Sequence, residues 1–335
     1  MKLPAILSIL CLSHLLAGPA LAGSGDIRAG TIVPGGTSYC NALREMGDTW
    51  HKAMPEKVNK FILSAGTRGE ADLVREMRSG NQQVGLLSVV GLSEIDPSVS
   101  ALQKIPLLFR SQEEVTIVRK RLERELNQKL EARGFVVLFW AEAGWVRFFS
   151  AEPAVRPADF KKLKIFTWKG DGQQVELMKK MGYQPVELET QDIASSLGRM
   201  IDCVPSVPFY ALFNQFDLVA KHMLELKWVP MVGACVMTRE AWYRYSPAEQ
   251  KTLLAAARLA GEKICEAGQR EDQESIEAMR QRGLKVHSLT PEAETEWRTL
   301  AESVYPQISG VMVPKESFDK VVSILKEIRS SPSQK

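Results

Sequence analysis

The sequence is poor in the side chains that build metal sites, disulfide frameworks and catalytic triads. Its 335 residues include only 5 cysteines and 4 histidines. Beyond residue 22 the histidines are His51, His222 and His287, which are far apart and lack the spacing that metal sites use. No nucleophile elbow and no cysteine–histidine signature is present. The sequence therefore predicts no catalytic residues, no metal site and no cofactor, and it does not indicate an enzyme.

A strong charge of either sign is also missing. Lysine and arginine total 43 residues and aspartate and glutamate total 40, which gives a formal net charge of +3. Loss of Lys2 with an N-terminal leader lowers this charge by one, to +2. Such a small charge does not indicate a nucleic acid or an anionic membrane as a partner. With 45% apolar residues and no repeats, the chain is typical of a globular protein large enough for two lobes.

Long apolar runs are confined to the N-terminus. Lys2 precedes an apolar stretch from Ala5 to Leu16, and Ala20-Leu21-Ala22 follows it. This is the pattern of a secretory signal peptide with a small-residue cleavage site. The stretch is also shorter than the ~20 residues that a membrane span needs. We therefore predict that residues 1–22 are removed by cleavage near Ala22 and that the mature protein lies outside the inner membrane.

Four cysteines remain after this leader, and they are Cys40, Cys203, Cys235 and Cys265. An oxidising compartment permits disulfides among them, with three possible pairings. Their spacing fits no metal motif, and a core of this size does not need a covalent link. Buried free thiols are therefore favoured over bridges, although both remain open.

Strands and helices alternate most clearly between residues 163 and 212. The apolar run 163–168 predicts a strand, and Gly170-Asp171-Gly172 then opens a helix. Two further apolar runs, 185–188 and 200–204, predict two more strands with a helix between them. This alternation indicates parallel strands with right-handed crossovers, and in such sheets ligands bind beyond the carboxyl ends of the strands.

The rest of the chain extends this pattern to an α/β fold of two lobes with a cleft between them and long C-terminal helices. Lobe I is predicted to cover residues 23–143, with part of 210–285 returning to it. The core of lobe II is predicted at 144–210. Residues 211–335 are predicted to form the C-terminal helices and a crossing strand that pack on both lobes.

The C-terminal part is predicted to be mainly helical. Residues 209–223 present an aromatic helical face, and 228–237 predict a strand. Ser246-Pro247-Ala248-Glu249 is a capping box with proline in the first turn, and it opens the longest helix, which continues to about Gln281. The apolar stripe between 318 and 328 predicts a final amphipathic helix that packs on the core.

Several segments together resemble the DctP-like solute-binding proteins of tripartite ATP-independent periplasmic (TRAP) transporters. Residues 71–88, 105–114 and 144–150 are similar to three motifs of that family, and LKI, MGYQPVEL and MID follow in the family's order. Trp242 followed by SPAEQ resembles the entry into the family's terminal helices. The resemblance implies a periplasmic receptor that closes two lobes over a solute and delivers it to TRAP membrane subunits.

At Phe166 the sequence departs from the common pattern of this family. Most members have an arginine there that holds the ligand carboxylate, whereas this chain has Lys164-Ile165-Phe166. It resembles instead the branch with FTW-x-G and MID-x-VP, which pairs with a tetratricopeptide-repeat (TPR) protein and is thought to bind hydrophobic ligands. A charge-assisted hydrogen bond and a buried phenyl ring each contribute ~1.5–3 kcal/mol. The exchange therefore favours an apolar or amphipathic ligand, including a monocarboxylate, and the alternative is a ligand-free scaffold or sensor.

The candidate ligand-binding residues lie at the predicted strand ends and in two loops of lobe I. Arg147 resembles the ligand-contacting arginine of the family, and the alternative is an interlobe salt bridge with a carboxylate such as Glu142. For Gly36 a plain turn, and for Val89 a core strand, are alternatives to a place in the cleft. The other candidates are apolar or aromatic, and they are Trp145, Phe166, Trp168, Val204, Pro205 and Phe209.

Overall fold

The computed structural model describes residues 25–67 and 69–330. The predicted signal peptide, residues 1–22, lies outside the described residues. The elements of the first half are β1 (Asp26–Thr31), α1 (Ser38–Ala53), β2 (Lys60–Ala65), α2 (Glu70–Arg78), β3 (Val84–Ser88), α3 (Val89–Ser93), the 3-10 helix η1 (Pro97–Leu102), α4 (Gln112–Ala132), β4 (Phe135–Ser150), α5 (Pro157–Phe160) and β5 (Lys164–Trp168). Those of the second half are α6 (Gly172–Lys180), β6 (Gln184–Leu188), η2 (Thr190–Asp192), α7 (Ile193–Ser196), β7 (Cys203–Ser206), α8 (Pro208–Phe213), η3 (Phe216–Leu218), β8 (His222–Thr238), α9 (Arg239–Trp242), α10 (Pro247–Gln281), β9 (Lys285–His287), α11 (Pro291–Ile308) and α12 (Lys315–Ser330).

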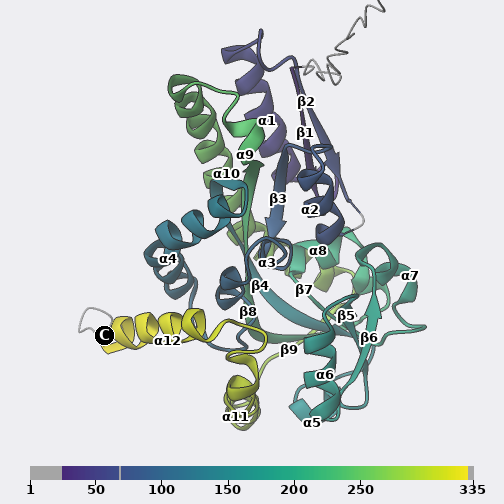
Figure 1. Cartoon of the computed structure of the whole chain (residues 1–335). Coiled ribbons are helices and arrows are strands. Elements are labelled where there is room, and N and C mark those ends of the chain that lie inside the picture. Colours follow the sequence, from purple (N-terminus) through teal and green to yellow (C-terminus); the bar gives the residue numbers. More distant parts are fainter. Residues whose placement is uncertain (1–24, 68, 331–335) are drawn as a thin grey trace, which may run out of the picture.

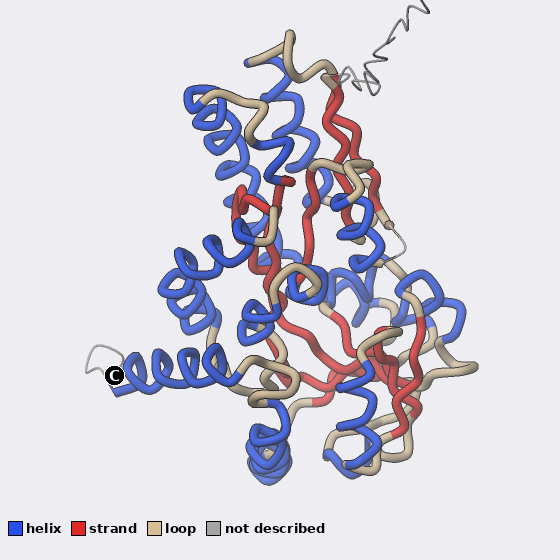
Figure 2. Tube along the Cα trace, viewed as in Figure 1, coloured by secondary structure: helices blue, strands red, loops and turns tan. Residues whose placement is uncertain are grey.

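Two long antiparallel strands, β4 and β8, run through both halves of the molecule (Figure 1). The strand order is β2-β1-β3-β8-β4-β7-β5-β6, and β9 pairs with the lower end of β8. The strands beside β4 and β8 are short and mutually parallel, β1 with β2 and β3, and β5 with β6 and β7. We call the half with β1–β3 lobe I and the half with β5–β7 lobe II; Figure 2 shows helices around the strands of both.

The paired strands β4 and β8 bend where the lobes meet. Their pairing is interrupted by register shifts between Val137 and Phe139, between Glu142 and Trp145, and between Val146 and Phe148. Such irregularities bend a strand and increase its local twist. The predicted limit between residues 143 and 144 falls inside β4, at the second of these shifts.

Each lobe buries apolar side chains on both faces of its part of the sheet. In lobe I one face packs against α2, α3, α4 and α12, and the other against α1 and α10. In lobe II the cluster around Phe149 and Phe166 covers one face, and the cluster around Phe148 and Ile165 covers the other. The α10 helix reaches both lobes, because Leu253 belongs to a lobe I cluster and Ile276 to a lobe II cluster. Ser246 caps α10 through the predicted capping box.

The prediction of a helix through residues 209–223 is wrong. The α8 helix ends at Phe213, Gln215 adopts a positive φ of 56°, and Met223 already lies in β8 opposite Phe149. The sequence pattern there fits a helix, but hydrogen bonds to β4 and burial of Met223 in the lobe II core determine the strand.

The four cysteines of the described chain are free thiols, with Cys40, Cys203 and Cys235 buried and Cys265 half-buried. Of the two alternatives that the sequence left open, the structure therefore has thiols. Burial raises the pKa of Cys203 and Cys235, which keeps both protonated. In the described ranges no helix combines the length and the hydropathy needed to cross a membrane.

Candidate functional site

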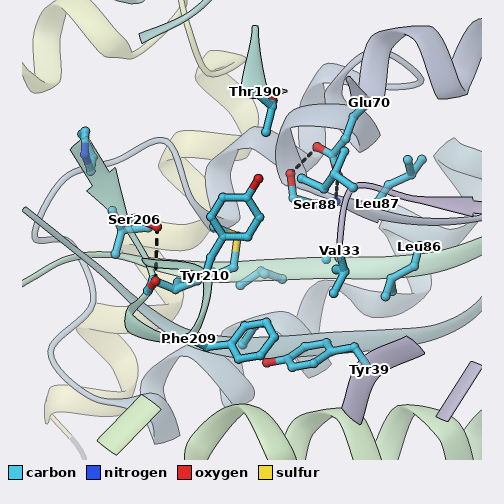
Figure 3. Close-up of a pocket in the computed structure, with 18 of the residues that line it drawn as sticks. Val33, Tyr39, Glu70, Leu86, Leu87, Ser88, Thr190, Ser206, Phe209 and Tyr210 are labelled. Atoms are coloured by element: carbon cyan, nitrogen blue, oxygen red, sulfur yellow. Dashed lines mark hydrogen bonds between the residues drawn. The ribbon is translucent and has the colours of Figure 1, made fainter. Parts of the chain in front are cut away.

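A cavity of about 130 Å³ lies between the lobes, beyond the carboxyl ends of β3, β5 and β7 (Figure 3). We call it the first cavity. Lobe I contributes Leu86, Leu87 and Ser88 at the end of β3, together with Val33, while lobe II contributes the ends of β5 and β7 and the start of α8. The ligand-binding edge expected from parallel strands therefore carries a cavity in this chain.

Most of the predicted aromatic and apolar site residues meet at this cavity. Those that line it are Phe166, Trp168, Val204, Pro205 and Phe209. Phe166 is 1% exposed, and its ring lies 5.0 Å from that of Trp168 at an interplanar angle of 67°. Both side chains come from β5, in which they share one face because they are two residues apart. Phe166 and Trp168 thus form an apolar wall of the cavity.

An aromatic pair spans the two sides of the cavity. Tyr39 of α1 stacks on Phe209 of α8 with ring centroids 5.1 Å apart. Figure 3 shows the two rings next to each other. Burial, and then the nearby carboxyl groups of Glu271 and Asp272, raise the pKa of Tyr39. The phenol therefore stays neutral, and the stacked pair links α1 of lobe I to the segment that follows β7 of lobe II.

Glu70 is the only charged side chain among the described residues that line the first cavity. Its carboxylate is buried and accepts hydrogen bonds from Ser88 N at 2.6 Å, Ser88 Oγ at 2.5 Å and Gly91 N at 3.0 Å. Burial raises the pKa of Glu70, and these hydrogen bonds oppose the rise. Glu70 thus fixes the end of β3 against the start of α3 and leaves an acidic group, not a cation, beside the cavity (Figure 3).

We expect the substitution Glu70→Gln to destabilise the fold most at low pH. Because the folded-state pKa of Glu70 is raised, the folded protein binds this proton more tightly than the unfolded chain does. The contribution of Glu70 to stability is therefore complete below the pKa that it has in the unfolded chain. It is lost as the pH rises through the pKa that Glu70 has in the folded protein, and the free energy of unfolding falls by at most ~1.4 kcal/mol per pH unit. Urea unfolding between pH 4 and pH 8 should show the wild-type advantage shrinking with pH, whereas Glu76→Gln, on the exposed face of α2, should not change the curve. A wild-type advantage that grows with pH would contradict this assignment.

Arg147 lies outside the first cavity and pairs with a carboxylate of α10. Its Nη1 donates to Asp272 Oδ2 at 2.8 Å, and the side chains of Arg147 and Asp272 are 7% and 13% exposed. Burial raises the pKa of Asp272, while the charges of Arg147 and Lys227 act in the opposite direction. Glu142, the partner suggested from the sequence, is instead bound by α4 side chains, and these are Gln112, Thr116 and Arg119. The arrangement favours the salt-bridge alternative, with Asp272 in place of Glu142.

The other three predicted residues lie near the cavity but do not line it. Trp145 is buried in the lobe I core, and Lys227 Nζ lies 5.7 Å from its ring centroid. Val89 is fully buried in the same core, although the preceding Ser88 lines the cavity. Gly36 has a φ of 82° in an exposed turn, which favours glycine, and the same loop reaches the cavity through Val33.

Sequence reasoning missed several lining residues, chiefly Tyr39, Glu70, Thr190 and Met231. Tyr210 also lines the cavity, next to the predicted Phe209, and the VPFYAL segment carried a signal for it. Glu70 carries no such signal, because an acidic residue in the first turn of a helix is ordinary. Only the fold brings α2 beside the end of β3. Among residues 25–67 and 69–330, no group of three or more His, Cys, Asp or Glu side chains could hold a metal ion.

A largely apolar cavity between two lobes that share crossing strands defines a two-lobe ligand-binding protein. Residues 29–310 match the DctP family, described as bacterial extracellular solute-binding protein, family 7. The chain therefore belongs to this family of solute-binding proteins. The predicted family and the predicted two-lobe α/β fold with long C-terminal helices are both confirmed.

Individual relatives are distant in sequence and close in fold. A solute-binding protein of Verminephrobacter eiseniae is 24% identical over 234 residues, which cover 69% of each chain. A TRAP periplasmic solute-binding protein of Ralstonia eutropha, solved with bound (S)-2-acetolactate, has a TM-score of 0.82 at 16% identity and covers 91% of this chain and 100% of its own. Another, of Xanthobacter autotrophicus with bound β-D-galacturonate, has a TM-score of 0.80 at 17% identity and covers 89% of this chain and 99% of its own.

Proposed function

We propose that this protein is the periplasmic solute receptor of a TRAP-type transporter and that it captures an apolar or amphipathic molecule in the first cavity. Membership in the DctP family and the two-lobe fold support the receptor role. Delivery to TRAP membrane subunits, and pairing with a TPR protein, are parts of the same proposal that rest on the resemblance of the sequence.

The proposed ligand class rests on the residues that line the first cavity. Among the described residues, the one charged group in this lining is the carboxylate of Glu70. Phe166, which is buried, stands where the resemblance to the family implies an arginine. A small dicarboxylate in this cavity would lose its hydration without a pairing cation, which costs several kcal/mol. An apolar body, by contrast, gains ~25 cal/mol for each Å² of surface that it buries against the aromatic and aliphatic walls. The cavity therefore favours an apolar ligand over the sugar acids and small carboxylates named for the solved relatives.

The cavity is lined by residues of both lobes, and this supports capture of the ligand by lobe closure. Val33, Leu87 and Ser88 belong to lobe I, whereas Phe166, Pro205 and Tyr210 belong to lobe II. A ligand that contacts both sets stabilises the closed arrangement and so shifts a hinge equilibrium toward it. The register shifts in β4 and β8 give the sheet a bend at the same level.

The proposal is tested by purifying the mature protein from its own periplasm and recording native mass spectra. We expect a mass increment from one bound organic molecule, and we expect organic extraction to release an apolar or amphipathic compound. The ligand-free scaffold alternative makes the opposite prediction, which is an unloaded protein that also fails to bind hydrophobic compounds added to it. That result would overturn the receptor role.

A further inference from the structure

A second cavity, of about 170 Å³, lies on the opposite face of the lobe II sheet from the first. Val204, which lines the first cavity, belongs to the apolar cluster on one face of this sheet. Phe148 and Ile165, which line the second, belong to the cluster on the other face. The second cavity is enclosed by α6 and β5 of lobe II, by α11, and by the segment that follows η1 in lobe I.

The two cavities share a wall of side chains near the carboxyl ends of β5 and β7. Val146, Phe166, Trp168 and Pro205 line both of them. Trp168 is half-buried, and its ring meets that of Phe166 edge to face. Rotation of a side chain in this wall would join the two spaces into one elongated site.

The second cavity is lined by apolar side chains, several of which are only partly buried by the protein core. On α6 only Val175 is buried, whereas Leu177 and Met178 are half-buried and line the cavity together with Met181, which follows the helix. Methionine adapts its shape readily to apolar partners. On the facing wall α11 presents Trp297 and Leu300. An unbranched or ring-bearing apolar chain would cover these surfaces.

Lys104 supplies the one cation among the described residues that line either cavity. Its Nζ lies 3.3 Å from Asp171 Oδ2, and the two side chains are 21% and 15% exposed. Lys104 follows η1 in lobe I, while Asp171 precedes α6 in lobe II, so the pair spans the interlobe boundary. A single contact of this length leaves two ammonium protons for another acceptor, which a ligand carboxylate can fill.

We propose that the second cavity binds the apolar chain of a long monocarboxylate, that Lys104 binds its carboxylate, and that the chain passes the wall at Phe166 and Trp168 into the first cavity. This inference rests on the proposed function and names the ligand class of the same interlobe region. Arg147 has no part in it, because it lines neither cavity.

The test is calorimetry on the delipidated mature protein with straight-chain fatty acids from hexanoate to tetradecanoate and with the matching primary alcohols. Burial of each methylene contributes ~0.8 kcal/mol, so affinity should rise about fourfold per methylene along the series. Each acid should bind at least about tenfold more tightly than its alcohol, because only the carboxylate adds an opposite charge to the hydrogen bond from Lys104.

Two matched pairs of variants separate the parts of the site. Met178→Trp fills only the second cavity and Met231→Trp only the first, and both methionines are half-buried. Each should shorten the chain length at which affinity stops rising. Lys104→Gln should remove the preference for acid over alcohol. Lys169→Gln should keep it, because exposed Lys169 makes an ion pair of the same 3.3 Å length, with Glu189, outside both cavities.

The outcomes distinguish this inference from the proposed function. If Met231→Trp shortens the series and Met178→Trp does not, the ligand is confined to the first cavity, and the second site is overturned while the receptor role survives. An unchanged acid preference in Lys104→Gln overturns the role of Lys104. Failure of the wild-type protein to bind any member of either series overturns this inference, whereas the receptor role is overturned only if native mass spectra also show an unloaded protein. If Met178→Trp does not fold, Leu300→Trp on the facing helix makes the same test.

Discussion

Replacing Phe166 by arginine should reduce the affinity for an apolar ligand by more than about 100-fold. Phe166 is 1% exposed and forms part of the wall that both cavities share. The side chains that pack around it in the lobe II cluster are hydrophobic, and the two carboxylates that line the cavities already have partners, Glu70 in Ser88 and Asp171 in Lys104. An unpaired cation there costs several kcal/mol, and each 1.4 kcal/mol changes an equilibrium tenfold.

The matched control is Phe166→Leu, which keeps an apolar side chain of smaller size. It should weaken binding by less than about tenfold, because it loses part of one contact surface and adds no charge. Fluorescence quenching of the tryptophans by dodecanoate, with succinate as the small-acid probe, measures both effects. Circular dichroism and thermal melting show whether each variant is folded. Equal losses in Phe166→Arg and Phe166→Leu would mean that ring shape, and not the absence of a cation, determines the ligand class.

The segment around Phe166 could be predicted from sequence because its signals are local. The apolar run 163–168 and the Gly-Asp-Gly turn predict a strand and a helix start, and the structure has β5 at Lys164–Trp168 and α6 from Gly172. The third strand is displaced, since the predicted run began at Met200, which is 53% exposed, and β7 begins at Cys203. Rules for parallel strands then locate the cavity at the strand ends.

What could not be predicted depends on contacts between segments that are distant in sequence. The position of Glu70 beside Ser88 requires α2 to pack at the end of β3, and the stacking of Tyr39 on Phe209 requires both lobes in place. Arg147 illustrates the same limit. The sequence left a salt bridge with a carboxylate such as Glu142 as an alternative for this residue, but the partner, Asp272, is 125 residues away in α10.

Removing that partner by Asp272→Ala should lower the free energy of unfolding by about 3–5 kcal/mol. The substitution leaves a guanidinium group buried without a counter-charge, and Arg147 Nε has no hydrogen-bond partner among the described residues to offset the loss. Gly144, with a φ of 85°, also lies close to this carboxylate, and a Cβ there would approach the carboxyl carbon to 3.0 Å. The pair thus lies at the bend of β4 and joins this strand to α10, so its loss should loosen the connection between the lobes.

The decisive comparison is the double variant Arg147→Met with Asp272→Leu, since replacing both members of a buried pair by apolar groups is often neutral or stabilising. Its free energy of unfolding should lie within about 1 kcal/mol of the wild-type value, whereas Arg147→Met alone and Asp272→Leu alone should each be far less stable.

The control is Glu240→Ala, which breaks the exposed helical pair with Arg244 and should lower the free energy of unfolding by less than ~0.5 kcal/mol. Urea unfolding measures all five variants, Asp272→Ala included. If Arg147 served mainly to hold a ligand anion, the double variant would keep its stability and lose its affinity for dodecanoate. Because Lys104 is the only cation among the described residues that line either cavity, we expect the double variant to keep both its stability and its affinity.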